Sequence, residues 1–157
     1  MKSLKKVLKK KKYQKIKLKK IMTNHLVVKA SINGVKGRFI LDTGASNSCV
    51  SFDLKKHFNV ISEKSDIKAA GAGSIDIDAE KSRNNSLKIG KWKTRNCDLI
   101  VFDLSYVNTA LIQQNAKEVQ GIIGADILES AKAFIDYNHK KLYLKKQKNS
   151  KVIKLPF

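Results

Sequence analysis

The sequence has few of the residues that mark several protein classes. It contains one proline and two cysteines among 157 residues, and few aromatic residues. This composition excludes collagen-like, mucin-like and disulfide-scaffold proteins. No apolar run approaches the roughly 20 residues that a membrane-spanning helix needs, so no membrane span is expected. The chain is 42% hydrophobic, enough to form the core of one folded domain with a tail.

Acidic residues are absent from the first 20 positions, which hold 11 lysines. The rest of the chain has 22 basic and 13 acidic residues, so this N-terminal segment carries much of the formal net charge of +20. Such a run is typical of a solvated arm or of one that contacts an anionic surface. The lysine-rich run is not followed by the apolar stretch that a secretory signal needs. The two cysteines form no disulfide framework. Both features favour a cytoplasmic location.

The apolar pattern predicts many short strands and few helices. A basic helix is expected over 2–12, and Ile16 and Leu18 then alternate with lysines as in a strand. The dipeptide Asn33-Gly34 predicts a hairpin between His25 and Leu41, because both residues tolerate the positive φ of a type I′ turn. Other hairpins are expected within 67–81, 87–102 and 133–144, and short helices at 104–116 and 125–130. Because no βαβ rhythm is present, the pattern favours a closed or folded antiparallel sheet.

The strongest chemical motif is Asp42-Thr43-Gly44, which directly follows the apolar strand Phe39–Leu41. A carboxylate at the junction of a buried strand and a tight turn is well placed for general acid–base work. Gly44 allows a sharp turn or a close approach to a ligand, and Thr43 can donate and accept hydrogen bonds.

A single carboxylate does not suffice to hydrolyse a peptide without a metal. One carboxylate must take a proton from water while an acid protonates the carbonyl oxygen, and two carboxylates that share a proton can do both. The sequence contains one Asp-Thr-Gly and no Asp-Ser-Gly. A two-fold homodimer would supply the second carboxylate, with one active site on the axis.

From about Asn24 to Leu144, the chain resembles the retropepsin-like aspartic proteases, in particular bacterial single-domain members. Asp42-Thr43-Gly44-Ala45-Ser46 looks like their catalytic loop. The segment 122–128, Ile-Ile-Gly-Ala-Asp-Ile-Leu, is similar to the second family element, in which a strand ending in glycine packs beneath that loop. The segments 133–137 and 141–144 are similar to the closing hairpin of the bacterial proteins.

This resemblance implies a mainly β fold, a closed acid-protease barrel with one or two short helices, plus a basic N-terminal arm. The expected division is 1–23 for the arm, 24–145 for the protease domain and 146–157 for a C-terminal tail. It also implies an obligate homodimer that cleaves extended peptides without a metal or other cofactor. The catalytic residues would be Asp42, Thr43 and Gly44, and the substrate-binding residues Ala45, Ser46, Gly71, Ala72 and Gly73, the last three near the tip of a flap.

One departure concerns the position after the downstream glycine. Retroviral members usually have an arginine there, paired with an acidic residue near the catalytic loop, whereas this chain has Ala125 and continues its loop with Ser46-Asn47. The contacts that brace the subunits must therefore differ from those of the retroviral members. The acidic residues Asp76, Asp78 and Glu80 are read as a solvated strand face, because Lys81 stands where a calcium loop needs glycine.

Two other functions stay open from the sequence. The same fold could be a catalytically silent dimeric module that holds extended peptides by strand addition. The lysine-rich segment could instead bind nucleic acid or an anionic surface through its charge. Tyr13 is the one aromatic residue in that segment, so base stacking is not indicated and no specific nucleic acid is expected.

Overall fold

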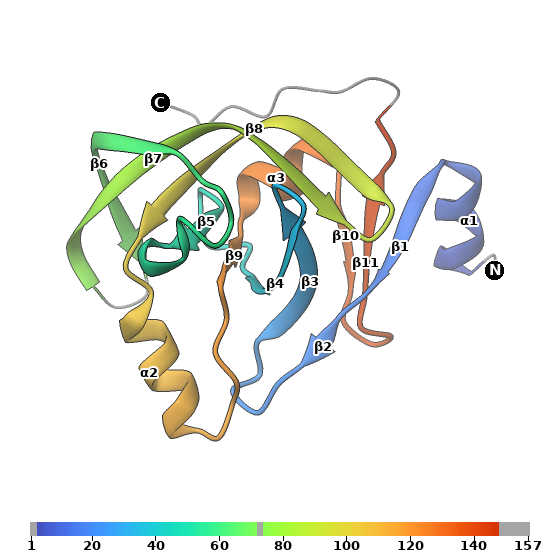
Figure 1. Ribbon diagram of the computed structural model, residues 1–157. Coiled ribbons are helices and arrows are strands. Elements are labelled where there is room, and N and C mark those ends of the chain that lie inside the picture. The colour runs from blue at the N-terminus through green and yellow to red at the C-terminus, as the bar shows by residue number, and fades with distance from the viewer. Residues whose placement is uncertain (1–2, 72–73, 148–157) are drawn as a thin grey trace.

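The computed structural model describes residues 3–71 and 74–147, with only the backbone described for 65–77. The chain is mainly β and folds into two sheets, with α1 and α2 at the outside of the molecule and α3 near its centre (Figure 1). Its elements are α1 (Leu4–Lys10), β1 (Tyr13–Lys17), β2 (Lys19–Lys20), β3 (Leu26–Ile32), β4 (Val35–Leu41), β5 (Cys49–Ser51), the 3₁₀ turn η1 (Phe52–Leu54), β6 (Ser62–Gly71), β7 (Ser74–Ile89), β8 (Trp92–Phe102), α2 (Ser105–Gln113), β9 (Gly121–Ile123), α3 (Ala125–Ser130), β10 (Phe134–Asp136) and β11 (Lys141–Lys145).

The larger sheet closes into a barrel. Its strand order is β2-β3-β4-β9-β5-β8-β7-β6, and a further pairing of β3 with β7 joins the two sides. The strands β3 and β4 form the predicted hairpin, with Asn33 and Gly34 at φ angles of 50° and 83°. Alternate residues of these strands, such as Val28, Phe39 and Leu41, face one core of aliphatic and aromatic side chains. The prediction of a closed, mainly β retropepsin-like barrel is confirmed.

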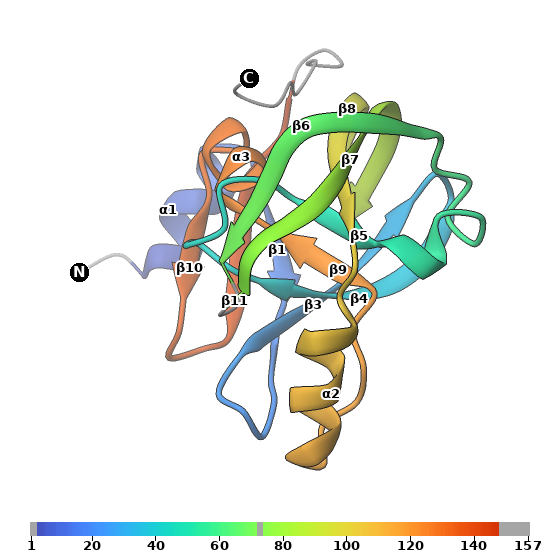
Figure 2. The same ribbon diagram turned by 90° about the vertical axis from the view of Figure 1, so that its left-hand side faces the viewer.

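A smaller sheet, in the order β1-β11-β10, lies beside the barrel (Figure 2). Strand β1 pairs antiparallel with β11 from Tyr13↔Lys145 to Lys17↔Lys141, and β2 pairs with β3. Within the basic segment, Leu8, Ile16 and Leu18 are buried. Most of residues 13–20 of the expected N-terminal arm therefore belong to strands of the two sheets, and lysines make up most of its exposed residues between 3 and 23.

The remaining elements agree with the sequence pattern in type and place. α1, α2 and α3 fall within the predicted helical segments, and β10 with β11 forms the predicted final hairpin. No helix in the described part of the chain is long and apolar enough to cross a membrane. Most of the expected C-terminal tail, 148–157, lies outside the described residues.

Candidate active site

The candidate catalytic loop lies where two parallel strands end together. β4 and β9 pair in parallel, with Ile40 opposite Ile122 and Leu41 opposite Ile123. The loop after β4 begins at Asp42, and the loop after β9 begins at Gly124. Because parallel neighbours end at the same edge of a sheet, the two predicted motifs meet although they are far apart in sequence.

Asp42 is fixed through its backbone and oriented through its side chain. Its N–H donates to the carbonyl of Ile123 at 3.0 Å. Its Oδ1 accepts the N–H of Gly44 at 2.9 Å, and its carbonyl accepts the N–H of Ala45 at 3.3 Å. The Asp42 side chain is partly buried, while Thr43 and Gly44 are exposed. The carboxylate thus emerges from a buried strand into a hydrogen-bonded turn that is open to solvent.

Gly124 allows the two loops to pass in close contact. A Cβ atom built at this glycine would lie 2.6 Å from the carbonyl oxygen of Ala45 and 3.1 Å from that of Asn47. The next residue, Ala125, donates its N–H to the same Ala45 carbonyl at 2.7 Å. The downstream motif therefore packs against the catalytic loop, as the resemblance implies.

A second contact holds the far end of the loop. The carboxylate of Asp126 accepts the backbone N–H of Ser48 at 2.9 Å and its hydroxyl at 2.7 Å. The Ser48 oxygen in turn accepts the N–H of Gly124 at 2.9 Å, and Ser48 is fully buried. Burial raises the pKa of the Asp126 carboxyl, although the hydrogen bonds from Ser48 act in the opposite direction.

Asp126 and Ser48 were not predicted as site residues. Asp126 appeared in the downstream motif without a role, and Ser48 has no motif of its own. The available signal was the position of Asp126 in the first turn of a helix that begins after a glycine-ended strand. An acidic residue there is favoured by the free N–H groups of the helix's own first turn, and its carboxylate has further oxygen lone pairs for donors of a loop that lies against the helix.

The predicted flap corresponds to the hairpin of β6 and β7. These strands pair antiparallel from Ser62↔Ser82 to Gly71↔Ser74. Gly71 is thus at the end of β6, whereas Ala72 and Gly73 lie outside the described residues. Their role in covering a substrate stays a prediction, as does the contact of Ala45 and Ser46 with substrate.

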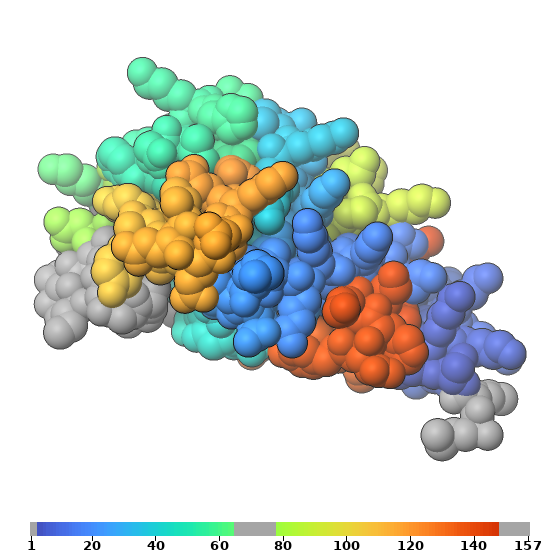
Figure 3. All heavy atoms as spheres, turned by 90° about the horizontal axis from the view of Figure 1, so that it is seen from below, coloured from blue at the N-terminus to red at the C-terminus, as the bar shows by residue number. Residues whose placement is uncertain are grey.

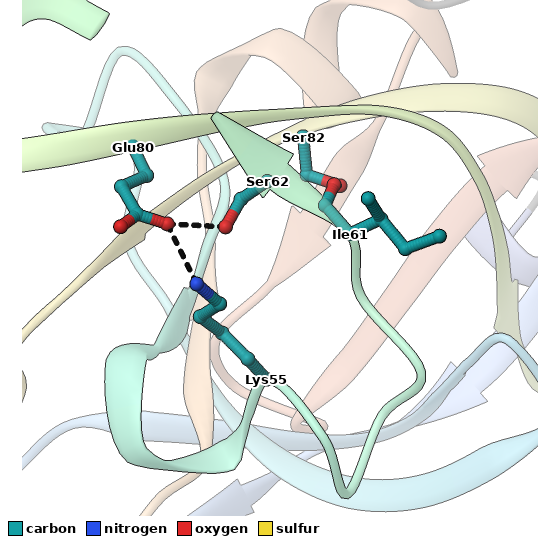
Figure 4. A network of polar contacts seen from close by, with 5 residues as sticks. All are labelled: Lys55, Ile61, Ser62, Glu80 and Ser82. Carbon is teal, nitrogen blue, oxygen red and sulfur yellow. Dashed lines mark hydrogen bonds and ion pairs between the residues drawn. The ribbon is translucent and has the colours of Figure 1, made fainter. Parts of the chain in front are cut away.

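A polar network fastens the base of this hairpin (Figure 4). Glu80 of β7 accepts a hydrogen bond from Ser62 of β6 and forms an ion pair with Lys55 at 2.8 Å. Ser82 donates its hydroxyl to the carbonyl of Ile61 at 2.6 Å. The network joins both strands of the hairpin to the turn after η1, so it limits how the hairpin base can move.

Neither a metal site nor a nucleophilic cysteine is supported by the described residues. No group of three His, Cys, Asp or Glu side chains within 3–71 and 74–147 is arranged to hold a metal ion. Cys49 and Cys97 are free and buried, and burial raises the pKa of both thiols. Neither thiol has the exposed, acidic character that a nucleophilic cysteine needs.

The barrel and the braced Asp-Thr-Gly loop define a retropepsin-like aspartic protease fold. A family model described as aspartyl protease matches residues 28–127, and the chain belongs to this family. Among curated protein sequences, none matches the chain.

Solved structures agree on the fold. A retropepsin-like aspartic protease from Rickettsia conorii is 20% identical with a TM-score of 0.57, and the match covers 84% of this chain and 90% of that one. The EIAV protease complexed with the inhibitor HBY-793 is 17% identical with a TM-score of 0.52, covering 70% and 90%. The retroviral protease-like domain of Ddi1 from Leishmania major is 18% identical with a TM-score of 0.51, covering 76% and 87%.

Proposed function

We propose that the protein is an aspartic endopeptidase that works as a homodimer, with Asp42 of each subunit forming the catalytic pair. The observation that carries this proposal is the geometry of Asp42. Its carboxylate leaves a buried strand at a solvent-open turn, and it is oriented by the Gly44 N–H at 2.9 Å. The loop that bears it is fastened to β9 and α3 within the same subunit.

The proposed chemistry needs two such carboxylates around one water molecule. One, ionised, takes a proton from the water, while the other, protonated, polarises the carbonyl of the scissile peptide bond. The two carboxyl groups titrate as a coupled pair, so activity is expected to have a bell-shaped dependence on pH. No metal or other cofactor takes part in this scheme.

Other residues of the loop have proposed roles around this pair. Thr43, exposed beside the carboxylate, would form hydrogen bonds between subunits beneath the pair. Gly44, Ala45 and Ser46 would lie along an extended peptide, and the β6–β7 hairpin would cover it from the other side. The two cysteines are free and buried, which agrees with the proposed cytoplasmic location.

The test compares peptide cleavage by the wild-type chain and by Asp42→Asn, with Asp103→Asn as the control. Asp103 accepts the N–H of Ser105 at 2.8 Å, and asparagine can accept the same bond, so the control should stay active and folded. Asp42→Asn should lose turnover while keeping its fold by circular dichroism. Undiminished cleavage by Asp42→Asn would remove the proposal.

A mixing experiment tests the shared site. Excess Asp42→Asn subunits added to wild type should lower its activity by forming mixed dimers, whereas Asp103→Asn should not. If the excess mutant leaves activity unchanged while sedimentation detects exchange of subunits, the two-subunit site is wrong. Binding of extended peptides without turnover at any pH would instead favour the silent peptide-binding module.

A further inference from the structure

The outward face of the small sheet gathers lysines and aromatic rings from both ends of the chain. In β11, Leu142 and Leu144 point into the core, so their neighbours occupy the opposite face. The strand register extends this face to β1 and β10, with Tyr13 opposite Lys145 and Phe134 opposite Tyr143. We call it the lysine–aromatic face and define it by Tyr13, Lys15, Lys17, Phe134, Lys141 and Lys145.

The two rings form a platform of which Phe134 is exposed and Tyr13 is partly buried. The rings of Tyr13 and Phe134 meet edge to face, with centroids 5.5 Å apart. They come from the outer strands β1 and β10, with β11 and the buried Tyr143 between them. Phe134 is 47% exposed, so about half of its surface is open to solvent. The sequence hides this arrangement because about 120 residues separate the strands.

Lysines are neighbours of the aromatic residues in the strand register, and two of them act electrostatically on Lys15. The pKa of Lys15 is lowered, first by the charge of Lys5 on α1, then by burial and by the charge of Lys141. Figure 3 shows the red surface of the β10–β11 segment beside the blue surface of the N-terminal residues. A bound polyanion would relieve this repulsion, so the charge of the face is complementary to a chain of phosphates.

One acidic residue lies on this part of the sheet. Asp136 is opposite Lys141, and its carboxylate accepts the N–H of His139 at 3.0 Å and contacts its ring at 2.8 Å. Both oxygens of this carboxylate therefore contact His139 in the turn that follows β10. In the register of β1 with β11, Lys15 lies opposite Tyr143 and Lys17 lies opposite Lys141, so neither has a carboxylate opposite it.

We propose that the lysine–aromatic face binds single-stranded nucleic acid without sequence preference. Lysines would follow the phosphates, and the exposed ring of Phe134 would receive an unstacked base. A duplex keeps its bases stacked and offers none to the ring. A membrane surface fits less well, because interfacial segments separate apolar and charged residues onto different faces, whereas Lys15 lies in the same cross-strand row as Phe134.

The first experiment measures binding of the full chain to a labelled oligouridylate of about 12 nucleotides by fluorescence anisotropy. Phe134→Ala should weaken binding about tenfold. The control is Tyr106→Ala, which removes a ring that is 65% exposed on α2, and it should bind like wild type. Equal affinity of wild type and Phe134→Ala, or tighter binding of the matching duplex, would overturn the proposal.

The second experiment measures the salt dependence of the same binding. The double variant Lys15→Gln/Lys17→Gln should flatten the slope of log K against log salt by about 1.4, since each phosphate contact contributes about 0.7 for a single strand. Lys29→Gln/Lys36→Gln removes the same charge from exposed positions of β3 and β4 and should leave the slope unchanged. Equal flattening by both variants would overturn the proposal, because only net charge would then matter.

Two further measurements distinguish this binding site from the catalytic loop and from a membrane contact. Asp42→Asn should bind the oligouridylate with wild-type affinity, since the face is built from different strands than the catalytic loop. Vesicles with anionic phospholipid serve as the competing probe. Binding to vesicles that depends on Phe134, together with no binding of the oligouridylate, would overturn the proposal in favour of a membrane contact.

Discussion

The carboxylate of Asp126 on α3 holds both the backbone N–H and the hydroxyl of Ser48, a residue 78 positions earlier in the chain. Ser48 ends the candidate catalytic loop, and its hydroxyl oxygen also accepts the N–H of Gly124. In this chain the loop is therefore braced from within the subunit by a serine–aspartate contact. The brace lies next to Ala125, the position at which the family resemblance implies an arginine in retroviral members.

Removing this carboxylate should cost both stability and activity. In Asp126→Ala, the buried N–H and hydroxyl of Ser48 lose their acceptor, which should lower the free energy of unfolding by about 2–4 kcal/mol. Asp126→Asn keeps one acceptor oxygen and should recover part of this loss. Urea denaturation measures the stability, and peptide cleavage under folded conditions measures the activity.

Glu129→Ala is the matched control for the brace. Glu129 lies on the same helix, is exposed, and its removal should change stability by less than about 0.5 kcal/mol. A loss in Asp126→Ala no larger than in Glu129→Ala would show that the brace contributes nothing. An Asp126→Asn variant that is folded but as inactive as Asp126→Ala would mean that the carboxylate charge, rather than its acceptor role, is required.

The brace also shows where sequence reasoning succeeds and where it stops. The hairpin at Asn33-Gly34 was predictable, because both residues adopt the positive φ that this turn needs. Helix α3 was predictable from its glycine and short apolar pattern. The pairing of Ser48 with Asp126 depends on β4 and β9 lying in parallel register, and no local pattern specifies which distant strands become neighbours.

The N-terminal segment illustrates the same limit. Alternating lysines and apolar residues over 13–18 predicted a strand with one solvent-exposed face, and β1 is that strand. Its partner β11 lies at the other end of the chain, so the sequence indicated the strand without its sheet. For the same reason the aromatic partner of Tyr13 was missed.

Two glycines of the site should respond differently to an added methyl group. In Gly124→Ala the Cβ would lie 2.6 Å from the backbone oxygen of Ala45, which cannot move without displacing the loop, so about 1–3 kcal/mol of stability should be lost. In Gly44→Ala the Cβ would meet the Asp42 Oδ1 at 3.2 Å. That carboxylate can turn aside, so Gly44→Ala should lose turnover with little loss of stability.

Thermal unfolding and cleavage rates of the two variants, measured side by side, check this contrast. Wild-type stability in Gly124→Ala would mean that the loops have room to separate. Full turnover in Gly44→Ala would mean that the orientation of the Asp42 carboxylate by this turn is not needed for catalysis.

The network at the hairpin base should make stability depend on pH. The pKa of Glu80 is lowered, mainly by the hydrogen bonds from Lys55 and then Ser62. Because the folded state holds the ionised form, this contribution is fully present above the ordinary value of 4.5 and is lost as the pH falls through the lowered pKa. The ion pair is partly exposed to solvent, so its contribution at neutral pH should be about 0.5–1 kcal/mol.

Glu80→Gln tests this dependence. At neutral pH it should be less stable than wild type, and the two proteins should converge as the pH falls below the lowered pKa of Glu80. Glu118→Gln, which changes an exposed glutamate before β9, should follow the wild-type curve throughout. A difference between Glu80→Gln and wild type that stays constant with pH would mean that the lost contact is not one of charge.

The buried residues of the basic segment should be needed for folding, whereas its exposed residues should not. Leu18 is 2% exposed within the main core, so Leu18→Ala should lower the free energy of unfolding by about 2–5 kcal/mol. Leu4→Ala changes a residue that is 44% exposed on α1 and should cost less than about 1 kcal/mol. Deleting residues 1–20 removes β1 and β2 and should therefore unfold the small sheet as well as remove charge. If the truncated chain instead melts like the full chain, the pairing of β1 with β11 contributes little to stability, and the segment is an arm that the domain can lose.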